Sequence, residues 1–164
     1  MFAFTPTTEH HLMRNVSINL LDDTPRPVVA IGTDYSHGHL LPFHTHRRAQ
    51  LLYGATGVMQ VSTHDGNWVV PPQRAVWIPA GVAHEVLMLG GSTRSLYIEP
   101  GAVDLGERCQ VIDVSPLMRH LLMEAVEVPL AYDPMGRDGL LHDLLLHQVT
   151  RSAPLHLHIP LPVD

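Results

Sequence analysis

The chain has 164 residues, of which 45% are hydrophobic and 16% are charged, a composition that fits one globular domain and argues against a disordered chain. Its net charge of −6 includes only 10 Lys+Arg, with no basic cluster beyond Arg47-Arg48, which argues against a nucleic-acid-binding surface. The single cysteine excludes an internal disulfide framework, and the lack of a signal-peptide pattern or membrane-length apolar run predicts a cytoplasmic protein without a membrane partner.

Short strand-like segments fill the chain from about Pro27 to Pro100. They read, in order, VVAIGTDY, GHLLPFHTH, AQLLYGATGVMQVSTHDGNWVV, RAVWIPAG and HEVLMLGGSTRSLYIEP. The third segment contains the hairpin turn HDGN, and Gly90-Gly91 divides the last segment into two runs. Short strands at regular spacing are typical of an antiparallel sandwich or barrel. We therefore expect a mainly β fold, with the barrel formed by residues 1–110.

Two amphipathic helices are expected after Glu107, as a helical hairpin over residues 111–150. Ser115 and Pro116 form an N-cap and a first-turn proline, Pro129 ends the first helix, and the second begins near Asp138. Apolar residues repeat at helical spacing at Leu117, Met118, Leu121, Leu122, Ala125 and Val126, and then at Leu140, Leu141, Leu144, Leu145 and Val149. The polar face of the second helix carries His142, Asp143, His147 and Gln148.

The leucine stripes of this hairpin have two expected uses. Part of their apolar surface covers an open face of the sheet. They are rich enough in leucine to leave further apolar area for a partner subunit. The sequence therefore predicts a homodimer, with an interface that includes Leu117, Leu121, Leu140 and Leu144.

The final segment, residues 151–164, has a different composition. Pro154, Pro160 and Pro162 exclude a helix and favour an extended, semi-rigid connector. A connector with nothing after it suggests that the chain stops short of a further domain.

Histidine is unusually frequent, with 13 in the chain. Most are interpreted as surface residues without a partner, among them His10, His11, His120 and His142. The stretch HTHRRAQLLYGATG is different, because side chains two residues apart on a strand face the same side. We therefore expect His44, His46 and Gln50 to converge. A second pair, His37 and His39, precedes Pro42 and is expected to be exposed to solvent.

A further histidine, His84, follows a Pro-Ala-Gly turn in WIPAGVAHEV. Three imidazoles and one side-chain oxygen suit a first-row divalent metal such as zinc, nickel, copper or iron. The alternative is that these histidines are hydrogen-bonded barrel residues without a metal. In that case Gln50 would orient His46 or a bound effector.

The spacing of these residues resembles the two signature motifs of the cupin superfamily. The pattern HxHxxxQ with the following Gly57 matches the first, and PxGxxH, which ends at His84, matches the second. The resemblance implies a small jelly-roll-like antiparallel β-barrel that holds a divalent metal, with zinc and nickel preferred. The ligands that it implies are His44, His46, Gln50 and His84. Cupins usually have glutamate where this chain has Gln50, and the weaker, neutral amide shifts the expected role from catalysis toward sensing.

A narrower resemblance covers nearly the whole chain. The segments RAQLLYGATGVMQV, GNWVVPPQRAVWIPAGVAHEV, RSLYIEP, SPLMRHLLMEAV and HIPLPVD are similar to the N-terminal sensor and dimerisation region of a subgroup of AraC-type transcription regulators. In that family a C-terminal pair of helix-turn-helix motifs follows the barrel and hairpin. The resemblance implies a domain that binds a small-molecule effector, dimerises, is not an enzyme, and contacts DNA only through the missing C-terminal domain.

Two alternatives remain open. A free-standing metal-dependent cupin enzyme, such as a dioxygenase or isomerase, would need a general base or an open coordination position. No paired carboxylates fall near the motifs, since Asp65 lies in a turn and Glu85 and Glu99 lie at or beyond strand ends. The other alternative is a dimeric structural cupin with an empty pocket.

The candidate residues of an effector pocket are Arg74, Tyr53 and Trp77. Arg74 could meet an anionic effector if it faces the interior, whereas the aromatic residues are more often part of the core or the barrel wall. Arg74 and Trp77 are an odd number of residues apart, so strict alternation allows only one of them to line the pocket. Cys109 is interpreted as an inert small residue near a strand end.

Overall fold

The structure is a computed structural model that describes residues 18–155 and 158–160. The expectations for His10, His11 and Pro162 lie outside these residues. Within them, no helix is both long enough and apolar enough to span a membrane.

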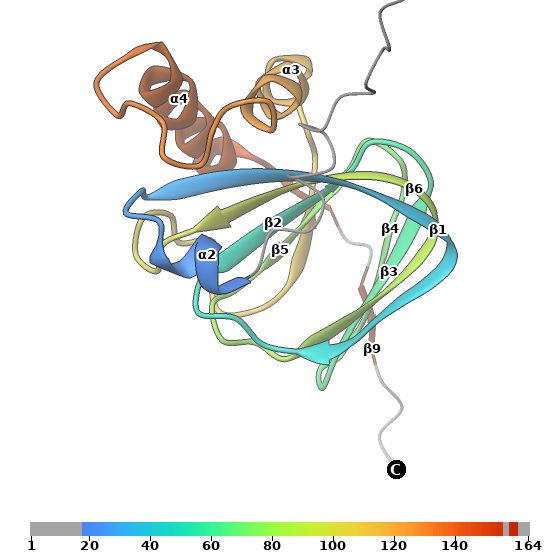
Figure 1. Ribbon diagram of the computed structural model, residues 1–164. Helices are drawn as coiled ribbons and strands as arrows, with labels where there is room; N and C mark the ends of the chain where they lie inside the picture. Colours follow the sequence, from blue (N-terminus) through green and yellow to red (C-terminus); the bar gives the residue numbers. More distant parts are fainter. Residues whose placement is uncertain (1–17, 156–157, 161–164) are drawn as a thin grey trace, which may run out of the picture.

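A single curled antiparallel sheet forms most of the structure (Figure 1). Its strands are β1 (Val28–His44), β2 (Ala49–Gly54), β3 (Val58–Thr63), β4 (Gly66–Val70), β5 (Ala75–Ile78), β6 (His84–Ile98), β7 (Gln110–Ile112), β8 (Pro154–Leu155) and β9 (His158–Pro160). They are hydrogen-bonded in the order β8-β7-β5-β2-β6-β3-β4-β9, and β1 pairs with β6. The expected mainly β, antiparallel fold followed by helices is confirmed.

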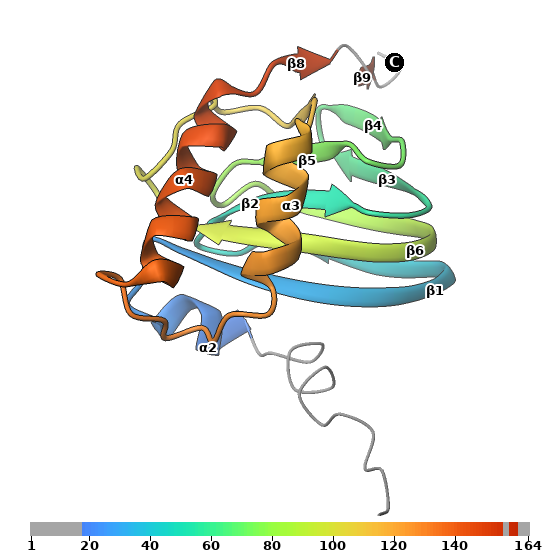
Figure 2. The same cartoon turned by 90° about the horizontal axis from the view of Figure 1, so that it is seen from above.

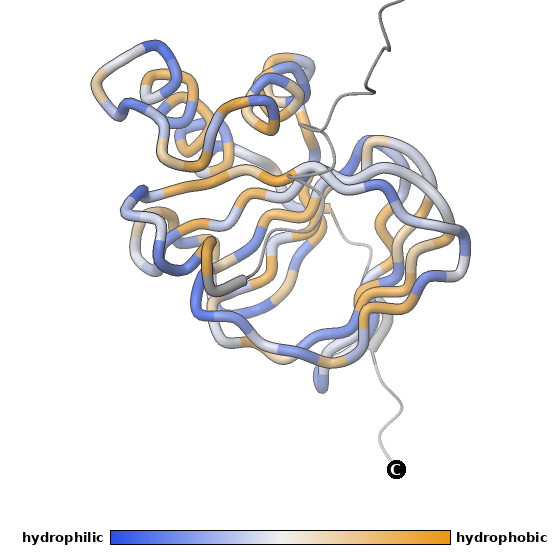
Figure 3. Tube along the Cα trace, in the orientation of Figure 1, coloured by the Kyte–Doolittle hydropathy of each residue, from blue (hydrophilic) through white to orange (hydrophobic). Residues whose placement is uncertain are grey.

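The two faces of the sheet bury different side chains, because neighbours on a strand alternate. On β2, Leu51 and Tyr53 belong to the core that the sheet forms with the helices. Leu52 belongs to the separate core inside the curl, together with Met59 and Val86. Figure 3 shows that β1 is hydrophobic beneath the helices and paler or hydrophilic along its far half. The sheet therefore has a helix-covered outer face and a self-enclosed inner face.

Strand β6 is one continuous strand where the sequence suggested two. It runs through Gly90 and Gly91, which both have positive φ angles, of 81° and 116°. At this point the backbone of Gly57 crosses it so closely that a Cβ atom on Gly57 would lie 1.9 Å from the carbonyl oxygen of Gly90. The two glycines therefore bend the strand without ending it, and the crossing fixes where it bends.

Helices α3 (Pro116–Ala125) and α4 (Arg137–Arg151) lie side by side over the outer face of the sheet (Figure 2). The Ser115 side chain accepts a hydrogen bond from the backbone N–H of Met118 at 3.1 Å, as expected of an N-cap. The buried residues of α3 are Met118, Leu122 and Ala125. The expected helical hairpin is therefore present.

The buried face of α4 differs from the expected leucine stripe. His142 is 1% exposed, whereas the sequence interpretation placed it on the polar surface. Its ring stacks on Tyr132, with centroids 3.9 Å apart and planes inclined by 14°, and its Nδ1 lies 2.7 Å from the Asp138 carbonyl oxygen. An aromatic partner and a carbonyl acceptor from the preceding turn together satisfy the imidazole, so it can replace a leucine in this core. Leu140, which belongs to the expected stripe, is exposed.

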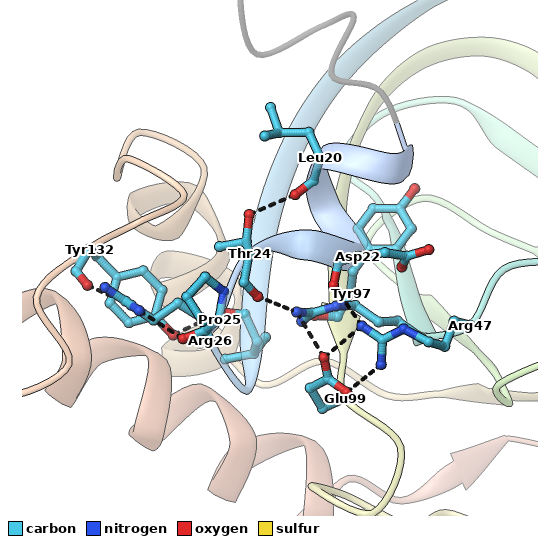
Figure 4. A network of polar contacts seen from close by, with 11 residues as sticks. Leu20, Asp22, Thr24, Pro25, Arg26, Arg47, Tyr97, Glu99 and Tyr132 are labelled. Atoms are coloured by element: carbon cyan, nitrogen blue, oxygen red, sulfur yellow. Dashed lines mark hydrogen bonds and ion pairs between the residues drawn. The ribbon is translucent and has the colours of Figure 1, made fainter.

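A short helix that the sequence interpretation missed, α2 (Ile18–Asp23), precedes the barrel. The residue that follows it, Thr24, offers its carbonyl oxygen to the guanidinium of Arg48 at 2.7 Å. Arg48 also forms an ion pair with Glu99 at 3.0 Å, and the exposed Arg47 binds the same carboxylate at 2.6 Å. Figure 4 shows this network, which fixes α2 to the end of the barrel.

The C-terminal segment also differs from the expected connector, in its described part. Pro154-Leu155 forms β8 beside β7, and His158–Pro160 forms β9 beside β4. Proline excludes a helix, but it is tolerated on an edge strand, where its missing N–H would not face a neighbour. These residues therefore extend the sheet rather than stand apart from it.

Candidate metal centre

The structure brings His44, His46 and His84 together at one end of the curled sheet. His44 ends β1 and pairs in register with His84, which begins β6, while His46 lies in the turn that leads to β2. One ring nitrogen of each histidine lies within 4.8 Å of the others. His84 and His46 are buried and His44 is exposed. These three residues could hold a metal ion that remains open to solvent on one side.

Each of the three imidazoles is oriented by a backbone carbonyl two residues away. The Nδ1 atoms of His44, His46 and His84 lie 2.7, 2.6 and 2.8 Å from the carbonyl oxygens of Pro42, Arg48 and Val82, respectively. A carbonyl accepts a hydrogen bond, so in neutral imidazole the proton is on Nδ1 and the lone pair is on Nε2. Metal-binding histidines in proteins are commonly oriented in this way.

The Nε2 atoms, which do not contact these carbonyls, favour a cation between the three histidines. Nε2 of His84 is buried and has no hydrogen-bond partner among the described residues. Nε2 of His46 lies 3.1 Å from Oε1 of Gln50. With the proton of His46 on Nδ1, this contact joins two acceptors, which repel each other unless a cation or a proton lies between them. The donor set of three Nε2 atoms and one amide oxygen therefore fits a divalent transition metal.

The side-chain amide of Gln50 is held in place by two hydrogen bonds. Its Nε2 donates to the hydroxyls of Ser95, at 3.0 Å, and Tyr97, at 3.3 Å. These two bonds turn Oε1 toward His46. Burial raises the pKa of Tyr97, so its phenol stays protonated. The amide at position 50 is therefore positioned as a ligand or as a hydrogen-bond partner of His46.

The two buried histidines are neutral at pH 7. Burial lowers the pKa of His84 to about 4, with the charges of His44 and His46 acting in the same direction against the Val82 carbonyl. Burial likewise lowers the pKa of His46, although the Arg48 carbonyl and the Gln50 side chain raise it by favouring the protonated ring. Neutral imidazole is the form that binds metal, so protons compete weakly at this site.

The cavity beside the histidines is small, with a volume of about 50 Å³. Its polar lining residues are Thr33, Tyr35, His44, Gln50, His84, Ser95 and Tyr97. Pockets for drug-sized ligands usually measure about 300–1,000 Å³. In this conformation the cavity has room for an ion with a few waters or a very small ligand.

The other predicted pocket residues do not line this cavity. Tyr53 and Trp77 are buried on the opposite face of the sheet, in the core with the helices. The reason is alternation: Gln50 faces the cavity, so Tyr53, three residues later, faces away. Arg74 lies just before β5, where it forms an ion pair with Asp113 at 3.3 Å. None of the three therefore contacts the cavity.

The cavity residues Ser95 and Tyr97 were not predicted as site residues. Tyr97 pairs with Gln50 across β2 and β6, and this register places its side chain beside the amide. The alternation in RSLYIEP shows that Ser95 and Tyr97 share a face. Which face that is depends on the strand pairing, which the sequence does not contain.

Three further residues are placed as the sequence suggested. His37 and His39 are exposed on β1 and do not join the histidine cluster. Cys109 is buried, and burial raises the pKa of its thiol to about 12, as expected for an unreactive cysteine. Cys109 borders a second, larger hollow of about 630 Å³ between β4, β7 and β8, away from the histidines.

Comparison with known proteins assigns the family. Residues 26–145 match the model of the AraC-like ligand-binding domain. The chain is 33% identical over 122 residues to the HTH-type transcriptional regulator NimR of Escherichia coli K12, covering 73% of this chain and 44% of the regulator. The chain thus spans less than half the length of that relative.

Solved structures give partial matches. An RmlC-like cupin from Shewanella frigidimarina is 20% identical, with a TM-score of 0.42 over 46% of this chain and 68% of that one. Oxalate decarboxylase from Bacillus subtilis is 17% identical, with a TM-score of 0.43 over 52% of this chain and 24% of that one. The family match covers most of the described fold, from β1 through most of α4. The chain therefore belongs to the AraC-like ligand-binding domain family.

Proposed function

We propose that the chain is the effector-sensing and dimerisation part of an AraC-type transcription regulator, and that a divalent metal in the histidine centre takes part in sensing. The family match and the regulator relative support the first statement. The convergence of the three imidazoles, and the buried Nε2 of His84 that has no partner among the described residues, support the second. DNA binding would reside in a further C-terminal domain, so the regulator would act in the cytoplasm, where its DNA lies.

The metal would be held by His44, His46 and His84, with Oε1 of Gln50 as the fourth donor. Three imidazoles and one neutral oxygen suit zinc or nickel. Bound metal would supply a positively charged centre that a carboxylate, hydroxyl or imidazole of a small effector can coordinate. His44 lies on the exposed side, so an effector would enter there.

Strand β6 offers a physical route from this centre to the helices. Ser95 and Tyr97 line the cavity, while Leu96 and Ile98 on the same strand pack in the core with α3 and α4. An effector that shifts β6 at the cavity would therefore also shift the surface on which the helices rest. In this way occupancy would favour one arrangement of barrel and hairpin over another.

The enzyme alternative has less support. No carboxylate lines the histidine cavity among the described residues, so a general base of that kind is lacking. The curated relative is a transcriptional regulator rather than an enzyme. We therefore favour a non-catalytic domain. Continuation of the reading frame for about another hundred residues, with two helix-turn-helix patterns, would agree with this assignment.

Dimerisation is proposed to use the leucines that the hairpin leaves in solvent. Leu140 is 69% exposed, Leu117 is 48% exposed and Leu144 is 39% exposed. Leu121 is only partly buried and packs against the chain's own core, so it would contribute less. Exposed leucines on two adjacent helices form an apolar surface of the kind that a second copy can cover.

The metal centre predicts a clear effect of histidine removal. Protein purified without an affinity tag should bind one zinc or nickel ion, and His84→Ala or His44→Ala should weaken binding by about 100-fold or more. His37→Ala, which removes an exposed histidine from the same barrel, should leave the affinity unchanged. Gln50→Glu should strengthen it, because a carboxylate adds negative charge beside the ion. Elemental analysis and calorimetry would measure these values; stoichiometric metal that survives both alanine variants would show that the ligands are wrong.

The dimer surface predicts a change of mass in solution. Leu140→Asp and Leu117→Asp should convert a dimer into a folded monomer, because each places a charge in an apolar interface. Met135→Asp is the matched control, since Met135 is 89% exposed in the turn before α4 and should not affect association. Sedimentation velocity would separate these outcomes. If all three variants sediment like the parent, the dimer does not use this surface.

A further inference from the structure

Three arginines lie around Tyr53, which belongs to the core between the sheet and the helices and not to the histidine cavity. Arg94 lies on β6 directly opposite Tyr53 of β2. Arg74 precedes Ala75, the other cross-strand partner of Tyr53. Arg119 comes from α3, where its guanidinium donates to the side-chain oxygen of Gln73 at 3.3 Å. Arginines from β6, from the turn before β5 and from α3 therefore lie near Tyr53.

The charges of this cluster are incompletely neutralised. Arg94 donates to the hydroxyl of Ser92 at 2.9 Å and to the carbonyl of Thr93 at 3.0 Å. The Ser92 hydroxyl in turn donates to the Asp34 carboxylate, which is therefore the nearest negative charge to Arg94 on this path, and the buried Nε of Arg94 has no partner among the described residues. Within residues 18–155 and 158–160, neither Arg94 nor Arg119 forms an ion pair with a carboxylate. Arg74 has only Asp113, at 3.3 Å in a half-exposed pair. Three arginines thus share two nearby carboxylates, Asp34 and Asp113, which leaves a positive excess in a chain whose net charge is −6.

The strand register places Arg94 directly beside Tyr53 and Arg74 next to its other cross-strand partner, and the contact with Gln73 brings Arg119 to the same place. Burial raises the pKa of the Tyr53 phenol, and Arg119, Arg94 and Arg74 act to lower it, in agreement with that geometry. Gln73, between them, has a φ angle of 63°. It is the only residue other than glycine with a positive φ among the described residues. Such backbone strain is typical of binding sites, where the surrounding structure holds it in place.

We propose that this arginine cluster, formed by Arg74, Arg94 and Arg119 around Tyr53, binds a small multivalent anion that carries phosphate or carboxylate groups. Guanidinium groups present forked N–H donors that match both kinds of oxyanion. The anion would connect β5 and β6 with α3. It would thereby restrict the movement of α3 relative to the sheet, independently of the metal centre.

Calorimetry on the metal-free full chain would test this site with pyrophosphate as the phosphate probe and citrate as the carboxylate probe, at ionic strength matched with potassium chloride. We expect saturable binding of one anion per chain, and the tighter probe identifies the preferred group. Arg119→Gln should weaken binding by about tenfold, the value of one lost charge-assisted contact. Arg94→Lys, which keeps the charge but removes the fork, should also weaken it.

Two control variants locate the site. Arg137→Gln removes an arginine that pairs with Glu124 and Asp138 elsewhere on the hairpin, and it should bind the anion like the parent. His84→Ala should also bind like the parent, because it alters only the histidine centre. Equal weakening by Arg119→Gln and Arg137→Gln, loss of binding in His84→Ala, or the absence of saturable binding in the parent would each overturn the proposal.

Discussion

Replacing Arg48 by methionine should lower the free energy of unfolding by about 3 kcal/mol, although the side chain lies in no predicted site. The Arg48 side chain is completely buried, and it binds Glu99 at 3.0 Å, the Thr24 carbonyl at 2.7 Å and the Tyr97 carbonyl at 3.3 Å. Methionine fills much of the volume but satisfies none of these acceptors. Equilibrium urea denaturation, followed by circular dichroism, would measure the loss.

The neighbouring Arg47 is the control for this experiment. It binds the same carboxylate at 2.6 Å, but it is about half exposed, so Arg47→Met should cost only about 0–1 kcal/mol. Equal effects of the two variants would mean that burial does not set the strength of this network. Arg48→Met keeps the backbone carbonyl that orients the His46 ring, so the loss of stability should come from the side-chain contacts alone.

The histidine centre was accessible from the sequence because its chemistry is local. His44, His46 and Gln50 lie within seven residues, and alternation along one strand predicted that they converge. They do converge, but through a turn, because His44 ends β1, His46 lies in the turn and Gln50 is on β2. His84 required a second motif, and the structure places it opposite His44 in the β1–β6 register. The orientation of the rings could not be foreseen, because it depends on carbonyls whose positions are set by the turns.

The effector pocket was harder to predict, because the face of the sheet on which a side chain lies depends on the pairing of strands that are far apart in the sequence. Tyr53 and Trp77 were correctly suspected of belonging to a core, but only the position of the helices shows that this core lies outside the barrel. Arg74 was predicted to meet an anionic effector if it faced the interior, but it lies outside the cavity and pairs with Asp113. Its neighbours Arg94 and Arg119 come from β6 and α3, and no local pattern connects those segments.

His142 illustrates the limit of helical periodicity. The leucines of α4 define an apolar stripe, yet the buried face is rotated to include His142 and leaves Leu140 in solvent. What decides the rotation is Tyr132 in the preceding loop, which stacks on the imidazole. A partner from outside the helix thus overrides the preference of the helix's own sequence.

Replacing Gly57 by alanine should destabilise the fold by about 3 kcal/mol or more, for two separate reasons. Gly57 has a φ of 73°, in the left-handed region that a Cβ atom disfavours. Its Cβ would also lie 1.9 Å from the Gly90 oxygen and 2.7 Å from the Gly90 carbonyl carbon. Both are backbone atoms of the central strand β6, so relief of the clash would move the strand that carries the cavity residues Ser95 and Tyr97.

The variant Gly101→Ala is the control that separates the strain of a positive φ from the steric clash with Gly90. Gly101 has a similar φ of 88°, but a Cβ atom there would meet no atom within 4 Å, so Gly101→Ala should cost only the left-handed strain of about 1–2 kcal/mol. Urea denaturation of both variants would show the difference. If Gly57→Ala were no more destabilising than Gly101→Ala, the crossing of residues 57 and 90 would not constrain the fold. If it is, the bend in β6, the strand that carries His84, Ser95 and Tyr97, is fixed by backbone contact at Gly57.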